Sequence, residues 1–308
     1  MGNRYCLICL LKENKRIFMK LAIILTCHNR IEKTKMALNT LINEEFLKQY
    51  NCDYIISLCD DGSSDNTANI IKSIYGEKVI VSYGNGNLFW NKGMALAMNS
   101  IKDVDVDFYI MINDDTIFYE NALEIMFENF FSYNDKKIAI SGAFHDEKLV
   151  TSYGGINVVN GIGVWVNPRD SILECELANW NCFLISKNYF NKIGEIDSYY
   201  QHAYGDWDYS KRIKLDGGHI YVTNKYVGIC NRNPDKGTYR DVKLGKMKRL
   251  WLMVQKNSVP FKSQLHYCRK FYKDEWIKRT MMPYIFLIVG DWRIYKKICN
   301  LRDVKKII

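Results

Sequence analysis

Residues 108–115 read FYIMINDD, and they give the strongest indication of the fold. A short, continuous apolar run bounded by polar residues is typical of a fully buried strand. Asn113, Asp114 and Asp115 then follow directly at its end. Adjacent carboxylates repel each other unless a positive charge lies beside them. In isolation an Asp-Asp pair is more often a helix cap or a solvated turn. After a buried strand it favours a site where oxygen ligands hold a hard divalent cation that also binds a diphosphate.

Outward from this stretch, apolar runs alternate with segments of helical periodicity. We expect strands at Leu21–Leu25, Tyr54–Cys59, Val79–Tyr83, Ile138–Ser141, Asn181–Ser186 and Ile220–Thr223, and helices at Ile31–Leu47, Asp65–Tyr75, Lys92–Ile101 and Asp206–Leu215. Ser64 and Asp65 offer N-cap chemistry for the second helix. This alternation predicts an α/β fold with a mixed, mainly parallel sheet flanked by helices.

Three polar clusters follow strands of this sheet: residues 26–30 (TCHNR), residues 60–63 (DDGS) and residues 113–115 (NDD). Ligands bind at the carboxyl ends of the strands in such sheets, so we expect the three clusters to share one edge. Asp61 in the second cluster either forms a tight turn or hydrogen-bonds a nucleobase. The sequence contains no GxxxxGK[ST] phosphate loop, so a metal ion is the expected partner of the phosphates.

A fourth polar group lies where a loop enters the predicted helix at Asp206. A helix N-terminus stabilises an ionised carboxylate, and a general base must be ionised to accept a proton. Asp206 is therefore a candidate base, with simple helix capping as the alternative. For Asp208 the two interpretations are a structural group and an acceptor-side group.

Taken in order, TCHNR, CDDGSSDNT, NDDT and GDWDYSKRI resemble glycosyltransferase family 2, which has the GT-A fold, and most of all its rhamnosyltransferase-like members from bacterial surface-polysaccharide synthesis. The resemblance runs from about Leu21 to beyond Arg240. It implies an inverting enzyme that uses a nucleotide-diphosphate sugar and Mg²⁺ or Mn²⁺. It further implies roles that we list here: Asp206 as the base; Asp115 as metal ligand; Thr26, Asn29, Arg30, Asp61, Asn87, Trp90, Asn113 and Asp114 in donor binding.

Two positions depart from the family pattern. Asn113 replaces the first acid of the DxD metal motif, which puts metal binding without donor in doubt. Gly205 replaces the glutamate beside the base, so an acceptor contact is either missing or supplied by His202 or Asp208.

The basic character of the chain belongs to its C-terminal quarter. Residues 236–308 carry 19 Lys and Arg against 5 Asp and Glu, whereas the other 235 residues carry 24 against 29. We therefore divide the chain into an N-terminal extension (1–18), a catalytic domain (19–235) and a basic, aromatic-rich helical extension (236–308). Basic and aromatic residues together suit an anionic membrane surface, so residues 244–308 either contact a membrane or pack on the domain.

These features favour a sugar transferase that uses a UDP- or dTDP-sugar and a glycan or lipid-linked glycan acceptor. A sugar-nucleotide nucleotidyltransferase and a catalytically silent scaffold are the alternatives. Nucleic acid is not an expected partner, because acidic residues line the predicted edge and the tail has no recognised nucleic-acid motif. Ten cysteines without a disulfide-like spacing, and no apolar stretch of the ~20 residues that span a bilayer, predict a cytoplasmic protein, peripheral at most to the inner face of the membrane.

Overall fold

The computed structural model describes residues 18–159 and 162–289. The strands of its main sheet are β1 (Met19–Cys27), β2 (Cys52–Asp60), β3 (Val79–Tyr83), β4 (Phe108–Ile112), β5 (Ile117–Phe118), β6 (Ile138–His145), β7 (Thr151–Tyr153), β10 (Leu173–Cys175), β12 (Cys182–Ser186) and β13 (His219–Ile229). Their order is β10-β13-β6-β12-β4-β1-β2-β3, with β5 pairing with β13 and β7 with β6. A smaller sheet joins β8 (Gly155–Val159), β9 (Ile162–Trp165) and β11 (Leu177–Ala178).

The direction of the strands confirms the predicted mixed, mainly parallel sheet. β1 runs parallel to both β2 and β4, and β13 runs parallel to β6. β12 is antiparallel to β4, with Cys182 opposite Ile112. The start of β12 therefore lies beside the end of β4, and this brings residues 179–181 to the edge where the polar clusters were expected.

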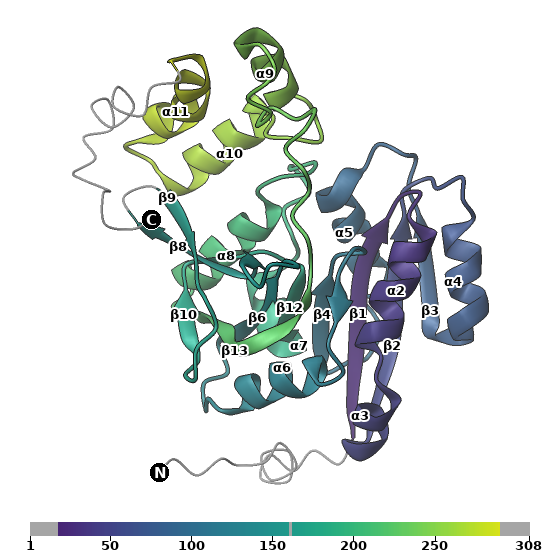
Figure 1. The fold of residues 1–308 in the computed structure, drawn as a ribbon. Helices are drawn as coiled ribbons and strands as arrows, with labels where there is room; N and C mark the ends of the chain where they lie inside the picture. The colour runs from purple at the N-terminus through teal and green to yellow at the C-terminus, as the bar shows by residue number, and fades with distance from the viewer. Residues whose placement is uncertain (1–17, 160–161, 290–308) are drawn as a thin grey trace.

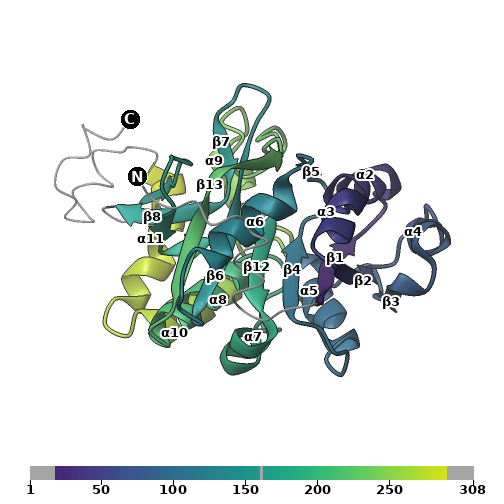
Figure 2. The ribbon, with the colours of Figure 1, turned by 90° about the horizontal axis from the view of Figure 1, so that it is seen from below.

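Helices cover both faces of the sheet (Figure 2). They are α2 (Ile31–Leu41), α3 (Glu44–Gln49), α4 (Thr67–Tyr75), α5 (Phe89–Ser100), α6 (Ala122–Phe131), α7 (Lys187–Ile193) and α8 (Gly205–Leu215), with a 3₁₀ turn, η1, at Gly76–Lys78. Side chains alternate between faces along a strand. Leu21, Ile23 and Leu25 of β1 accordingly join a core with α2, α3, α4 and α6, whereas Ala22 and Ile24 join one with α5, α7 and α8.

The predicted helix at Ile31–Leu47 is two helices. α2 ends at Leu41, and the side chain of Asn43 accepts hydrogen bonds from the backbone N–H groups of Glu45 and Phe46 to begin α3. An asparagine side chain that binds the backbone in this way competes with continuation of the helix. The apolar periodicity is insensitive to this effect, and it therefore predicted a single helix. The N-cap of α4 is Asn66 rather than Ser64 or Asp65, and the helix begins at Thr67. Asp65 still satisfies first-turn N–H groups of two helices, because its carboxylate accepts from Thr67 N of α4 and Ile31 N of α2.

The C-terminal segment is helical as far as residue 289, as α9 (Lys246–Met253), α10 (Phe261–Phe271) and α11 (Trp276–Val289). Figure 1 shows these helices at the upper end of the molecule, toward which β1 runs. Among the described residues, none of the helices has the length and apolarity to cross a membrane. The predicted extension at 1–18 lies almost wholly outside the described residues, which begin at Phe18.

Candidate active site

The first loop of the site, residues 26–30, is held to its neighbours by side-chain hydrogen bonds. Thr26 Oγ1 donates to the carbonyl of Cys59 at 3.1 Å. Asn29 adopts a left-handed φ of 51°, and its Oδ1 accepts from Ser64 N at 2.7 Å and from Ser64 Oγ at 3.0 Å. Asparagine tolerates this conformation better than most residues. The loop is thereby tied to the one that follows β2, and Arg30 is left at its exposed end.

Arg30 lies between the two acids that follow β4. Its Nη1 is 3.0 Å from Asp114 Oδ1 and 3.2 Å from Asp115 Oδ2. Asp114 is buried, and burial raises the pKa of its carboxyl to about 6 although Arg30 acts against this rise. Asp115 is partly buried. The positive charge that the acidic pair requires is therefore supplied within the protein, by the guanidinium.

The carboxylates of Asp114 and Asp115 suit only part of a cation site. Carboxylate oxygens are the ligands that hard divalent cations prefer. Over residues 18–159 and 162–289, however, no group of three or more His, Cys, Asp or Glu side chains could hold a metal ion. Asn113 adds no free ligand, because its Oδ1 accepts from Trp90 Nε1 at 2.8 Å. Asp114 and Asp115 fit a metal that takes its remaining ligands from a bound diphosphate.

Asp61 follows β2 directly and lies beside the loop that enters α5. It is 4% exposed, and its carboxylate accepts three backbone hydrogen bonds, from Gly86 at 2.8 Å, Leu88 at 2.9 Å and Phe89 at 3.0 Å. These bonds shape the loop that enters α5. Asp61 therefore organises the loop that enters α5, and three of the roughly four acceptor positions of its carboxylate are taken by backbone N–H groups.

Asn87 and Trp90 lie on either side of the entrance to α5. Asn87 is exposed, and its carbonyl accepts from Gln201 Nε2 at 2.7 Å. Trp90 is partly buried, with its ring edge-on to Trp180 at 5.9 Å between centroids. Trp90 thus packs in the core and also contacts Asn113 at the sheet edge. Asn87 contacts Gln201, which belongs to the segment before α8.

Asp206 lies in the first turn of α8 and is linked to the end of β4. Its Oδ2 accepts from Asn179 Nδ2 at 3.0 Å, and two residues further along the carbonyl of Asn181 accepts from Asn113 N at 3.4 Å. Burial raises the pKa of Asp206 to about 6, yet the residue is not sealed from solvent. Asn179 was not predicted, because an asparagine before a strand has no sequence signal that distinguishes it from a turn residue.

No residue larger than glycine fits at position 205 while Asn91 keeps its position. An added Cβ at Gly205 would be 1.5 Å from Asn91 Oδ1. Asn91 is itself fully buried, and its Nδ2 donates to the carbonyls of Asp197 and Tyr200. The missing glutamate of the family pattern is thus matched by an asparagine that fills the adjacent space.

The two residues proposed for the acceptor side separate in the structure. His202 is exposed, and its pKa is lowered by partial desolvation of its ring and, to a smaller extent, by the charge of Arg30. Asp208 is fully buried, and its carboxylate is held by Arg212 at 2.8 Å and Lys270 at 2.6 Å. These contacts favour the structural interpretation of Asp208, because its carboxylate is paired inside the protein.

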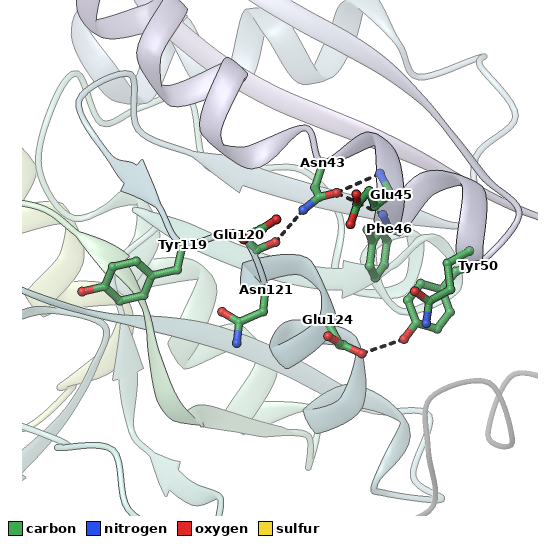
Figure 3. Close-up of a pocket in the computed structure, with 9 residues that line it drawn as sticks. Asn43, Glu45, Phe46, Tyr50, Tyr119, Glu120, Asn121 and Glu124 are labelled. Atoms are coloured by element: carbon green, nitrogen blue, oxygen red, sulfur yellow. Dashed lines mark hydrogen bonds between the residues drawn. The ribbon is translucent and has the colours of Figure 1, made fainter.

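A pocket of about 510 Å³ lies apart from these residues, between α3 and the start of α6. Figure 3 shows Glu45, Glu120 and Glu124 around it, with Tyr50 Oη donating to Glu124 Oε1 at 2.7 Å. None of the predicted site residues lines this pocket.

Residues 22–171 match the protein family described as Glycosyl transferase family 2, and this segment contains the three polar clusters of the sheet edge. Over this segment, which is just under half of its length, the chain belongs to glycosyltransferase family 2. This family 2 protein is 33% identical over 123 residues to the poly-beta-1,6-N-acetyl-D-glucosamine synthase of Staphylococcus aureus strain COL, a match that covers 40% of this chain and 28% of that protein. The chain thus spans less than a third of the length of the curated relatives it matches.

Two solved structures share the GT-A fold of this family 2 protein. GalNAc-T7 with UDP, GalNAc and Mn²⁺ has a TM-score of 0.56 at 13% identity, over 95% of this chain and 57% of that one. S. aureus TarS 1–349 in complex with UDP-GlcNAc has a TM-score of 0.52 at 15% identity, over 88% of this chain and 82% of that one. At such identities the likeness concerns the fold alone.

Proposed function

We propose that this chain is an inverting glycosyltransferase that moves a sugar from a UDP- or dTDP-sugar to a hydroxyl of a glycan or lipid-linked glycan, in the synthesis of a cell-surface polysaccharide. The observation that carries the proposal is the placement of Asp206, which is linked through residues 179–181 to the acidic end of β4. Family membership supports it, as do the UDP and GalNAc bound by one structural neighbour and the UDP-GlcNAc bound by the other.

In the proposed reaction Asp206 accepts the proton of the attacking acceptor hydroxyl. A pKa of about 6 leaves most of this carboxyl ionised at neutral pH while keeping it basic enough to accept a proton. Asn179 orients the carboxylate through Oδ2, and Trp207 N–H holds Oδ1 at 2.9 Å. The hydroxyl oxygen then forms its bond to the anomeric carbon as the bond to the diphosphate breaks, with no covalent sugar–enzyme intermediate.

Asp115, with Asp114 beside it, would hold Mg²⁺ or Mn²⁺ together with the donor diphosphate. Such a cation offsets the negative charge that develops on the leaving diphosphate. Arg30 now occupies the position between the two carboxylates, so it must share or release them when the donor binds. The metal is therefore expected to bind with the donor and weakly without it.

On the donor side we assign contact roles to the edge residues Thr26, Asn29, Arg30, Asn87, Trp90, Asn113 and Asp114. We assign Asp61 an indirect role, through the loop that it holds at Gly86, Leu88 and Phe89. On the acceptor side we retain His202, which is exposed near Arg30.

The proposal also includes a catalytic domain at residues 19–235, between an N-terminal and a C-terminal extension. It further includes contact of residues 244–308 with an anionic membrane. The membrane proposal is supported by large apolar side chains that α9 and α11 leave exposed among basic residues. Met247 and Trp251 of α9 are 76% and 60% exposed, and Ile277 of α11 is 60% exposed.

The experiment that tests the proposed function is a thermal-shift screen of UDP- and dTDP-sugars, each with and without Mn²⁺ or Mg²⁺. A ligand that binds only the folded state raises the melting temperature. We expect a donor to raise it with metal present and metal alone to leave it almost unchanged. Failure of every nucleotide sugar to stabilise the protein, or to support transfer to a polysaccharide acceptor, would contradict the proposal.

A further inference from the structure

The segment that leads into Asp206, residues 197–204, is held by α10 of the C-terminal extension. Asp197 begins this segment, and its Oδ2 is 3.1 Å from His266 Nε2 and 3.0 Å from Lys270 Nζ. Both partners belong to α10. The backbone N–H of Tyr199 and these two side chains lower the pKa of Asp197 to about 2, against the effect of burial.

Lys270 also reaches the other side of Asp206. Its Nζ is 2.6 Å from Oδ2 of Asp208, which is fully buried in α8. Tyr200 Oη donates to the same oxygen at 3.0 Å. One lysine on α10 therefore joins residues 197 and 208, which flank the proposed base in the sequence.

Between these two anchors the backbone adopts an unfavourable conformation. Tyr204 has a φ of 81°, in the left-handed region that residues with a side chain rarely occupy. Its ring stacks on that of Tyr267, with 5.0 Å between centroids and 27° between planes. Tyr267 is buried on the same helix as Lys270, three positions before it. Such backbone persists only where the surrounding structure holds it.

We propose that α10 is a positioning element for Asp206 and that Lys270 and Tyr267 are the positioning residues through which it acts. Lys270 joins Asp197 and Asp208, the two acids on either side of the proposed base. Tyr267 holds Tyr204, two residues before Asp206, in the conformation from which α8 starts. This inference rests on the proposed role of Asp206. It assigns to the C-terminal extension a part in the transfer step that is separate from any membrane contact.

The first test compares Lys270→Met with Lys262→Met, an exposed lysine at the start of the same helix that serves as the matched control. We expect Lys270→Met to lower kcat by about 10-fold to 100-fold, because a misplacement of ~1 Å can have an effect of that size. The KM for the donor should stay unchanged, since the donor-side loops are held by Asp61 and Ser64. Lys270→Arg, which keeps the charge, should recover much of the rate, and Lys262→Met should match the wild type.

A second pair of variants addresses Tyr267, whose hydroxyl has no hydrogen-bond partner among the described residues. Tyr267→Phe keeps the stacked ring and should behave as wild type, whereas Tyr267→Ala should lower kcat in the same way as Lys270→Met. Equal rates for Tyr267→Ala and Tyr267→Phe would overturn the role of the stack.

Hydrogen exchange gives a readout that does not depend on turnover. In Lys270→Met the amides of residues 197–208 should exchange faster, while those of β1 and β4 keep their protection. If the wild type transfers no sugar, the proposed function fails and this comparison still tests the positioning. If the wild type is active and Lys270→Met equals Lys262→Met in both rate and exchange, the positioning role is wrong.

Discussion

Asp206 and Asp208 are two positions apart on α8 and differ in what surrounds their carboxylates. Asp206 has amide partners and a pKa raised to about 6 by burial, whereas Asp208 has two basic partners, Arg212 and Lys270. Burying a charge is unfavourable unless it is paired. The same substitution should therefore have opposite effects on stability at the two positions.

Asp206→Asn should abolish transfer and stabilise the fold near neutral pH. The pKa of Asp206 is about 6 in the folded state, above the ordinary value of 3.8. Between these two pH values the folded state binds more protons than the unfolded state does. The contribution of this group to stability is therefore lost as pH rises through 6. The asparagine removes that loss, which at pH 7 amounts to at most about 3 kcal/mol. Urea unfolding of the wild type and of Asp206→Asn at pH 7.5 and pH 4 measures the difference in stability. If the variant is more stable than the wild type by the same amount at pH 4, ionisation of Asp206 is not the cause.

Asp208→Asn is expected to destabilise the protein by about 3–5 kcal/mol, the usual effect of breaking a buried ion pair by removing one partner. Its unfolding midpoint in urea at pH 7.5 should fall well below that of the wild type. Equal midpoints for Asp208→Asn and Asp206→Asn would mean that the two buried carboxylates do not differ as described.

The pH profile of kcat gives another residue-scale test. Because only ionised Asp206 can accept a proton, kcat should fall about tenfold per pH unit below the pKa of about 6. The measurement is transfer rate at saturating donor from pH 5 to pH 8. A rate that stays flat down to pH 5 would exclude this carboxylate as the base.

At the scale of elements, α5 is oriented by contacts at its first turns. Asp61 accepts three N–H groups of the loop that enters it, and Asn91 in its first turn packs against Gly205 of α8. α5 thus joins the donor side of the site to the segment that carries Asp206.

Asp61→Asn should weaken donor binding more than it lowers kcat. The amide group would face at least one backbone N–H, and an unmatched buried donor costs about 1–3 kcal/mol. Titration of the donor in the presence of Mn²⁺ measures the change, and Glu77→Gln, an acid-to-amide change at an exposed position of η1, is the control. A donor affinity equal to that of Glu77→Gln would show that the loop does not depend on Asp61.

Gly205→Ala should lower both stability and kcat, although alanine is the better helix former. The added Cβ would overlap Asn91 Oδ1, and α5 and α8 must separate to accommodate it. Circular dichroism melting and transfer rates report the two effects. Removing the obstruction in the double variant Gly205→Ala/Asn91→Ala should restore part of the stability lost at position 205; a purely additive loss would argue against this contact.

At the scale of the whole molecule, the C-terminal helices carry two kinds of surface. α10 is packed on the catalytic part through Tyr267 and Cys268, which are 4% exposed, whereas α9 and α11 leave Met247, Trp251 and Ile277 exposed. Both interpretations of the tail, packing on the domain and contact with a membrane, can therefore hold for different helices.

The double variant Met247→Ser/Trp251→Ser should bind anionic vesicles less than the wild type does, with transfer to a soluble acceptor unchanged. Co-sedimentation with phosphatidylglycerol vesicles at low and high salt measures binding, and neutral phosphatidylcholine vesicles are the control. Charge attraction weakens with salt, so wild-type binding should also fall at high salt. Partitioning that is equal for both proteins would remove the membrane proposal.

Local sequence pattern was enough to predict seven strands, β1–β4, β6, β12 and β13, and the edge at which the polar clusters gather, but not the short strands β5 and β7–β11. The apolar run at residues 108–112 needs burial on both faces, and parallel neighbours place their carboxyl ends together, so local pattern and topology were enough. The predicted bounds of β3 and β4 are those observed, and the β12 and α8 predictions differ by one residue.

The partners of the polar side chains could not be predicted from the sequence, because they depend on contacts between distant parts of the chain. Arg30 meets Asp114 and Asp115 across more than eighty residues of chain, Asn179 meets Asp206, and Lys270 meets Asp208. Asp61 was assigned to a ligand, and its oxygens are taken by backbone groups 25 to 28 residues away. Hydrogen bonds and ion pairs act over about 3 Å and depend on direction, so periodicity along one chain carries no information about them.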